Sequence, residues 1–160
     1  ADPFGVEEGG ETAGLGLLDA ETVFEKRKIR SRVAGRFQKP EGIFGNLRGV
    51  PFEGYEIHMG KTRGTSPALS TVTSRQGETR PDGMSKGNVF GSYVHGLFDS
   101  EDVCRGILDS LLKAKGVAAA TEKTGWNIKE YKNRQYDLLA DAVQASLDMK
   151  RVYRILEKGV

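Results

Sequence analysis

Two histidines and one cysteine are the residues of this chain best suited to proton transfer or nucleophilic attack. His95 ends an apolar stretch, is followed at once by Gly96 and precedes a predicted helix start at Ser100. Ligands of α/β proteins gather at the carboxyl ends of strands, and a histidine, with an ordinary pKa of about 6.5, exchanges protons around neutral pH. His95 is therefore either a general base or a histidine hydrogen-bonded at a strand end for structural reasons. Position alone leaves the two interpretations equal.

The other histidine, His58, lies in residues 54–60, a segment with the alternation of a strand. This alternation places Glu56 and His58 on one face and Tyr55, Ile57 and Met59 on the other. The pattern favours a structural, hydrogen-bonded His58 over a catalytic one. Glu56 and His58 alone are weak evidence for a metal site, and the chain has no CxxC or HxxxH spacing. We therefore expect no metal site.

Cys104 is the only cysteine, which rules out an internal disulfide and fits a reducing cytosol. It falls on a predicted amphipathic helix beside Val103, where we expect a partly buried small residue. A nucleophilic cysteine needs exposure and a lowered pKa, and nothing near Cys104 in the sequence supplies either.

Composition restricts the partners of the chain. Its 160 residues carry 24 basic and 22 acidic side chains, a near balance that gives little long-range attraction for nucleic acid. The basic run at residues 26–32 is read as a solvated strand rather than as a nucleic-acid patch. No apolar run approaches the roughly 20 residues that span a bilayer, so we expect no membrane partner. The N-terminus is neither basic nor apolar and lacks methionine, and so predicts a segment cut from a longer protein, without a signal peptide.

The elements that must position these residues are strands first and helices last. We predict extended structure over residues 22–37, 52–59 and 68–73, a loop over 77–87 and a short buried strand over 88–94. The regions 2–14 and 38–51, rich in glycine or proline, read as a loop and a turn.

Capping residues then mark the predicted helices. Ser100 suits a helix N-cap, and apolar residues from Val103 to Leu112 give that helix one apolar face. Asn127 with Glu130 resembles a capping box, and Asp148 is predicted to cap a last helix through Leu156. The order indicates an α/β layer structure with substantial antiparallel content, and no linker divides the chain convincingly.

Three segments together resemble the cobyric acid synthases. They are residues 54–60 (GYEIHMG), 90–99 (FGSYVHGLFD) and 136–141 (YDLLAD). The opening residues, 2–7 and 14–18, are similar to the stretch that follows the nucleophile in that family. The resemblance covers nearly the whole chain in order.

This resemblance implies that residues 1–160 are the C-terminal portion of a class I glutamine amidotransferase domain, an α/β, flavodoxin-like fold with a mixed sheet and C-terminal helices. In such enzymes a cysteine attacks the amide of glutamine and a histidine activates it; the matching histidine is His95. The parent enzyme is expected to be cytoplasmic and to amidate carboxylates of a corrinoid, adenosylcobyrinic acid a,c-diamide. It would use ATP and Mg²⁺ in a separate synthetase domain, leaving no cofactor in this fragment.

Two departures from the wider class follow from the same resemblance. The cysteine would lie just upstream of Ala1, so the fragment is expected to be inactive. Loss of the strand that carries the cysteine should expose an apolar edge of the sheet, so the fragment is also expected to self-associate. Leu97 stands where many class I enzymes have a glutamate that orients the histidine, and neither Asp99 nor Glu56 is assigned to that role. Alternatives are a sister amidotransferase, either cobyrinic acid a,c-diamide synthase or a cell-wall precursor amidase subunit, or a non-catalytic docking module.

Overall fold

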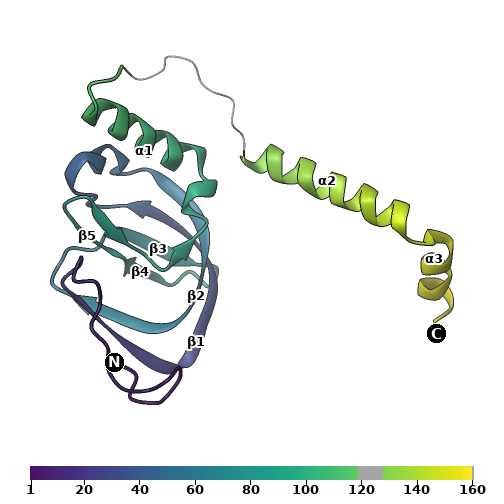
Figure 1. Cartoon of the computed structure of the whole chain (residues 1–160), viewed down its shortest axis with the longest axis horizontal. Helices are drawn as coiled ribbons and strands as arrows, with labels where there is room; N and C mark the ends of the chain where they lie inside the picture. The colour runs from purple at the N-terminus through teal and green to yellow at the C-terminus, as the bar shows by residue number, and fades with distance from the viewer. Residues whose placement is uncertain (119–127, 160) are drawn as a thin grey trace. The chain divides into compact units, whose positions relative to one another are not determined.

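The computed structural model describes residues 1–118 and 128–159. The chain divides into two compact units, Ala1–Glu122 and Lys123–Val160, and each is described by itself (Figure 1). None of the described helices is both long and apolar enough to cross a membrane.

The first unit is built on a five-stranded sheet in the order β4-β3-β1-β2-β7, with a separate two-stranded ribbon, β5-β6. Every strand pair among the described residues is antiparallel. The bounds are β1 (Ala20–Phe37), β2 (Pro51–Gly64), β3 (Ser70–Ser74), β4 (Thr79–Asp82), β5 (Met84–Lys86), β6 (Val89–Gly91) and β7 (Val94–His95). The sheet is therefore a hairpin, β1 with β2, extended by short strands on both sides.

The basic run lies in β1, at a break in its pairing with β2 between Phe24 and Ile29. Residues 26–30 are exposed, which confirms the solvated strand predicted there. β3 pairs only with Val33–Phe37 of β1, so the earlier part of β1 has a strand on one side alone. Charged side chains on such an open edge discourage pairing with another chain.

One face of the sheet carries the core of the first unit. The buried apolar side chains are Val33, Phe37, Leu47, Phe52, Leu69, Val72, Val94 and Val103. The Phe37 and Phe52 rings lie 4.9 Å apart, centroid to centroid. Each fully buried side chain of this size contributes about 1.5–3 kcal/mol.

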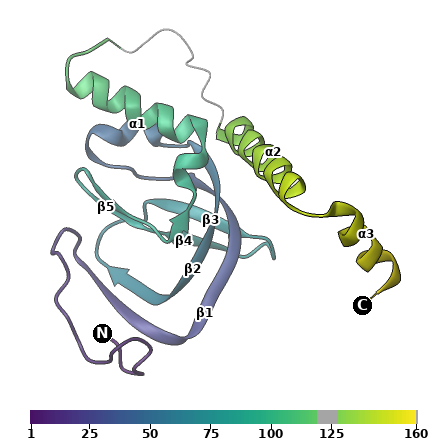
Figure 2. The ribbon, with the colours of Figure 1, turned by 45° about the vertical axis from the view of Figure 1, so that its right-hand side comes forward.

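The helix α1 (Glu101–Ala114) packs against η1 (Gly42–Leu47), a 3₁₀ segment between β1 and β2, and the turned view shows the same contact (Figure 2). The Asn46 side chain donates to the Gly106 carbonyl at 2.7 Å, and the Ser110 hydroxyl donates to Asn46 at 2.6 Å. Ser100 caps α1 as predicted, because its hydroxyl accepts from the Val103 amide.

The second unit consists of α2 (Ile128–Ser146) and α3 (Met149–Lys158). The Asp148 carboxylate accepts from the Arg151 amide at 3.1 Å, which confirms the predicted cap of the last helix. The predicted capping box falls on Asn127, which lies outside the described residues.

Two predictions of local structure are wrong. The loop expected over residues 77–87 contains β4 and β5, because β4 finds its hydrogen-bond partners in β3. The single buried strand expected over 88–94 is divided into β6 and β7, which belong to different sheets. The mixed α/β character, with antiparallel strands and C-terminal helices, is confirmed.

Candidate active site

His95 is the second residue of β7, at one end of the strand order. Its side chain is exposed. Gly96 follows with φ 86°, a conformation that favours glycine, and turns the chain into η2 (Leu97–Asp99) and then α1. The structure thus places His95 between a strand end and a helix start, as the sequence predicts.

The ring of Tyr55 lies against the ring of His95. The two residues are cross-strand partners in β2 and β7. Their rings are stacked, with centroids 5.0 Å apart and planes at 8°. The stack restricts the rotation of an otherwise exposed imidazole, so Tyr55 is a neighbour of His95 that sequence reasoning missed. Alternation put Tyr55 on the face opposite Glu56, but gave no register with β7.

Close backbone approach at Gly54 makes this pairing possible. A methyl group on Gly54 would lie 2.3 Å from the His95 carbonyl oxygen and 2.5 Å from the Val94 side chain. Only glycine therefore fits between β2 and β7 without displacing the strand that carries His95.

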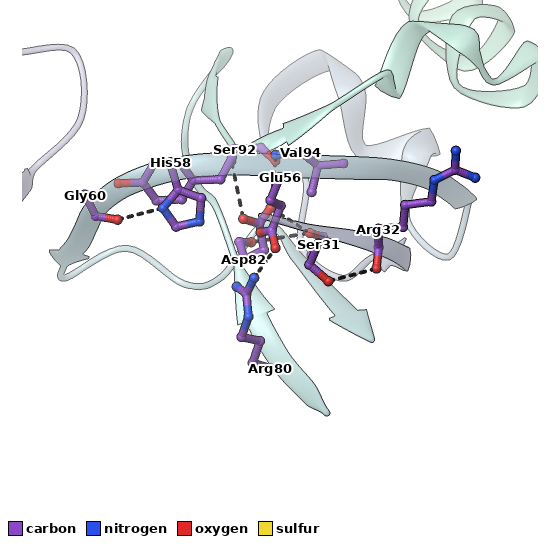
Figure 3. Close-up of polar contacts among 11 residues, drawn as sticks. Ser31, Arg32, Glu56, His58, Gly60, Arg80, Asp82, Ser92 and Val94 are labelled. Atoms are coloured by element: carbon purple, nitrogen blue, oxygen red, sulfur yellow. Dashed lines mark hydrogen bonds and ion pairs between the residues drawn. The ribbon is translucent and has the colours of Figure 1, made fainter. Parts of the chain in front are cut away.

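The Glu56 side chain projects from the face of the sheet opposite to that of His95. It pairs with Val94, whose side chain is in the core, and Glu56 itself is 0% exposed. Its carboxylate forms an ion pair with Arg80 of β4 (Figure 3). Leu97, two residues after His95, packs against the core. Neither residue is placed to orient the imidazole.

A second buried acid, Asp82, holds the segment that leads into β7 (Figure 3). Its carboxylate accepts from the Ser92 hydroxyl at 2.7 Å and from the Tyr93 amide at 3.3 Å. The Ser92 hydroxyl oxygen in turn accepts from the Val94 amide at 3.0 Å. Because Asp82 and Arg80 fall in the segment predicted as a loop, sequence reasoning missed both.

His58 shares the buried side of β2 with Glu56. Its Nδ1 lies 2.8 Å from the Gly60 carbonyl oxygen, and since a carbonyl only accepts, Nδ1 carries the proton. The ring stacks on Tyr93 with centroids 3.8 Å apart, and the Tyr93 hydroxyl is 2.5 Å from that of Thr62. These contacts agree with a structural, hydrogen-bonded histidine.

Cys104 is half-buried on α1, as the sequence predicts. Its thiol donates to the Phe98 carbonyl at 3.0 Å. Burial raises the pKa of the Cys104 thiol, and the Asp99 carboxylate raises it further. A thiol held in its neutral form is a poor nucleophile, so Cys104 does not supply what His95 would activate.

Within residues 1–118 and 128–159, no three side chains of the metal-ligating types come together as a metal site. At His95 itself, the structure shows an exposed imidazole whose ring is stacked on that of Tyr55.

Comparison with known proteins defines the class of this arrangement. Residues 1–103 match the CobB/CobQ-like glutamine amidotransferase domain, and the chain belongs to that family.

Three similar curated proteins are all cobyric acid synthases. The chain is 49% identical to the cobyric acid synthase of Ruminiclostridium cellulolyticum, over 99% of the chain and 32% of the relative. It is 42% identical to that of Lachnoclostridium phytofermentans, over 99% of the chain and 33% of the relative. It is 42% identical to the cobyric acid synthase of Yersinia enterocolitica, over 96% of the chain and 31% of the relative. The chain thus spans about a third of the length of these curated relatives, and the resemblance seen in the sequence is confirmed.

Proposed function

We propose that this chain supplies the histidine of the glutaminase site in a cobyric acid synthase, and that His95 is that histidine. The observation that carries the proposal is the exposed imidazole at the end of β7, inside the residues that match the amidotransferase family. An imidazole there is accessible to a nucleophile and to glutamine at once.

The reaction proposed for the site has two steps. A cysteine thiol, from a part of the parent protein outside residues 1–160, gives its proton to His95 and attacks the amide carbon of glutamine. His95 returns the proton to the leaving nitrogen, so ammonia departs and a thioester remains. His95 then takes a proton from water, which attacks the thioester and releases glutamate and the thiol.

The ammonia has its use elsewhere in the parent enzyme. We propose that a synthetase domain activates carboxylates of adenosylcobyrinic acid a,c-diamide with ATP and Mg²⁺, and that ammonia converts them to amides in cobalamin biosynthesis. Residues 1–160 are assigned no cofactor in this scheme. A cytoplasmic location fits these substrates.

The fold of the whole domain is part of the proposal. β7 pairs with β2 along one edge, and no other described strand pairs with β7. An open edge beside His95 suits a further strand, which in a flavodoxin-like amidotransferase domain would bring the nucleophile. The antiparallel sheet described here would then be one wing of a larger mixed sheet.

Variants of the full-length parent protein test the assignment of His95. We expect His95→Ala to lower glutamine-dependent amidation by about 10²–10⁴-fold, the range for loss of a general base. Amidation with ammonium salts in place of glutamine should persist, since it bypasses the site. Cys104→Ser serves as the control and should leave both rates unchanged. If the His95→Ala enzyme still amidates at the parental rate with glutamine as the nitrogen donor, the proposal is wrong.

The isolated chain should have no glutaminase activity. Its one cysteine, Cys104, has a raised pKa and donates its thiol proton to a backbone carbonyl. Incubation with glutamine should therefore release no more ammonia than a His95→Ala control of the same chain. Release above that control contradicts this prediction and makes residues 1–160 a complete glutaminase.

A further inference from the structure

A row of three exposed side chains crosses the sheet at His95. Arg32 of β1 is the cross-strand partner of Tyr55 in β2, and Tyr55 is the partner of His95 in β7. Directly opposite residues project from the same face of a sheet. The next row, made by Glu56 and Val94, is buried on the other face. Arg32, Tyr55 and His95 therefore lie side by side on the open face.

The guanidinium of Arg32 is available to a ligand. Arg32 is exposed, and no described residue forms an ion pair or a hydrogen bond with its guanidinium; the Ser31 hydroxyl donates to the Arg32 backbone carbonyl alone, at 3.1 Å. In Figure 3 its side chain extends from the strand away from the Glu56–Arg80 ion pair. An arginine presents a planar fork of donors that matches a carboxylate.

Other arginines on this part of β1 are not equivalent to Arg32. Arg30 pairs with Ile57, which lies two residues along β2 from Tyr55 and therefore one position further along the same face. Arg36 lies towards the other end, and its guanidinium already donates to the Gly49 carbonyl. Arg32 is the arginine in register with His95.

Spacing fits a small amino acid between the two ends of the row. Two interstrand steps separate the backbones of Arg32 and His95 by about 10 Å. The long arginine side chain and the short carbon chain of glutamine together can bridge that gap. Tyr55, a residue that is 47% exposed, lies between them, and its ring offers an apolar surface to the methylene groups of the substrate.

We propose that Arg32 binds the α-carboxylate of the glutamine whose side-chain amide reacts beside His95, with the Tyr55 ring beneath the chain of the substrate. This inference rests on the proposed glutaminase function and adds the group that recognises the substrate as an amino acid. Arg32 is then a binding residue and takes no proton.

Substrate discrimination by the full-length parent protein tests the role of Arg32. The probes are glutamine and γ-aminobutyramide, which keeps the reacting amide and lacks the α-carboxylate. We expect the parent to prefer glutamine, and Arg32→Met to reduce the ratio of the two kcat/KM values by at least about tenfold, as for loss of a charge-assisted hydrogen bond. The loss should lie mainly in KM for glutamine. Arg32→Lys should recover part of it.

Arg30→Met is the matched control, because it removes a guanidinium from the same strand and face and should keep the ratio unchanged. The ratio does not depend on how much enzyme is folded, so an unstable Arg32 variant still gives an answer. An Arg32→Met enzyme that discriminates as the parent does, or an Arg30→Met enzyme with the same loss, overturns the inference. If His95→Ala keeps full glutaminase activity, the proposed function itself fails; with that variant inactive, an unchanged ratio removes only the role of Arg32.

Discussion

The thiol of Cys104 shows how two local contacts determine the chemistry of a residue. Burial and the Asp99 carboxylate raise its pKa above the ordinary 9.0. A raised pKa means that the fold favours the neutral thiol. This contribution to stability is complete below pH 9.0 and is lost as the pH rises through the pKa of the folded chain.

Alkylation measures this shift. We expect iodoacetamide to modify Cys104 in the folded chain more slowly than in the urea-unfolded chain, since the thiolate is the reacting form. The rate should rise with pH to a midpoint above 9.0. Cys104→Ser gives the background rate. A folded-state midpoint at or below that of the unfolded chain contradicts the prediction.

Glu56 and Arg80 form a pair whose two members respond differently to substitution. Glu56 is completely buried, whereas 34% of the Arg80 side chain is exposed. Arg80→Met leaves a carboxylate buried without its counter-charge and should destabilise the first unit by about 3 kcal/mol. Glu56→Gln leaves an arginine that water can reach, and should cost less, about 1 kcal/mol. Urea unfolding of both variants checks the order, and equal losses would count against it.

At the level of elements, the contact between β2 and β7 depends on Gly54. A Cβ at this position meets the His95 carbonyl, a backbone atom that moves only if β7 moves. Gly54→Ala should therefore lower stability by about 1–3 kcal/mol, as overpacking does, and weaken the Tyr55–His95 stack. The ring-current shift of the His95 proton signals, followed by NMR, reports the stack directly.

Gly45 provides the control for Gly54. It lies in η1, and a methyl group there would meet nothing within 4 Å. Gly45→Ala should leave both stability and the His95 signals unchanged. If the two alanine variants behave alike, close approach at Gly54 is not what positions β7.

Elements with a local signal were predictable from the sequence. Alternation of apolar and polar residues predicts β1 and β2, and the capping residues Ser100 and Asp148 predict the starts of α1 and α3. β4 was not predictable, because residues around Pro81 resemble a loop and become a strand only by pairing with β3.

The same limit applies to the site. Alternation separates Tyr55 from Glu56 but does not say which of them is buried. Glu56 faces inward because Arg80, 24 residues further along the chain, neutralises its charge. Non-local pairs of this kind also set the register that brings Tyr55 against His95, and no local pattern encodes them.

For the whole molecule, the second unit leaves an apolar stripe on α2. Tyr136, Leu139 and Val143 recur at helical spacing and are 65%, 61% and 45% exposed. Within this unit no described residue buries them. An apolar stripe that its own unit leaves exposed favours association, which supports the proposal that the isolated chain self-associates.

Size-exclusion chromatography with light scattering tests this proposal on the 160-residue chain. We expect an apparent mass that rises with concentration, since association through an apolar stripe removes it from water. Leu139→Lys should shift the chain towards the monomer, because a charge at the centre of the stripe is costly to bury. Leu15→Lys is the control, as Leu15 is 90% exposed in the loop before β1 and is not part of the stripe, and should not alter the mass. A monomer at every concentration contradicts self-association, and equal effects of the two lysines would place the contact elsewhere than on α2.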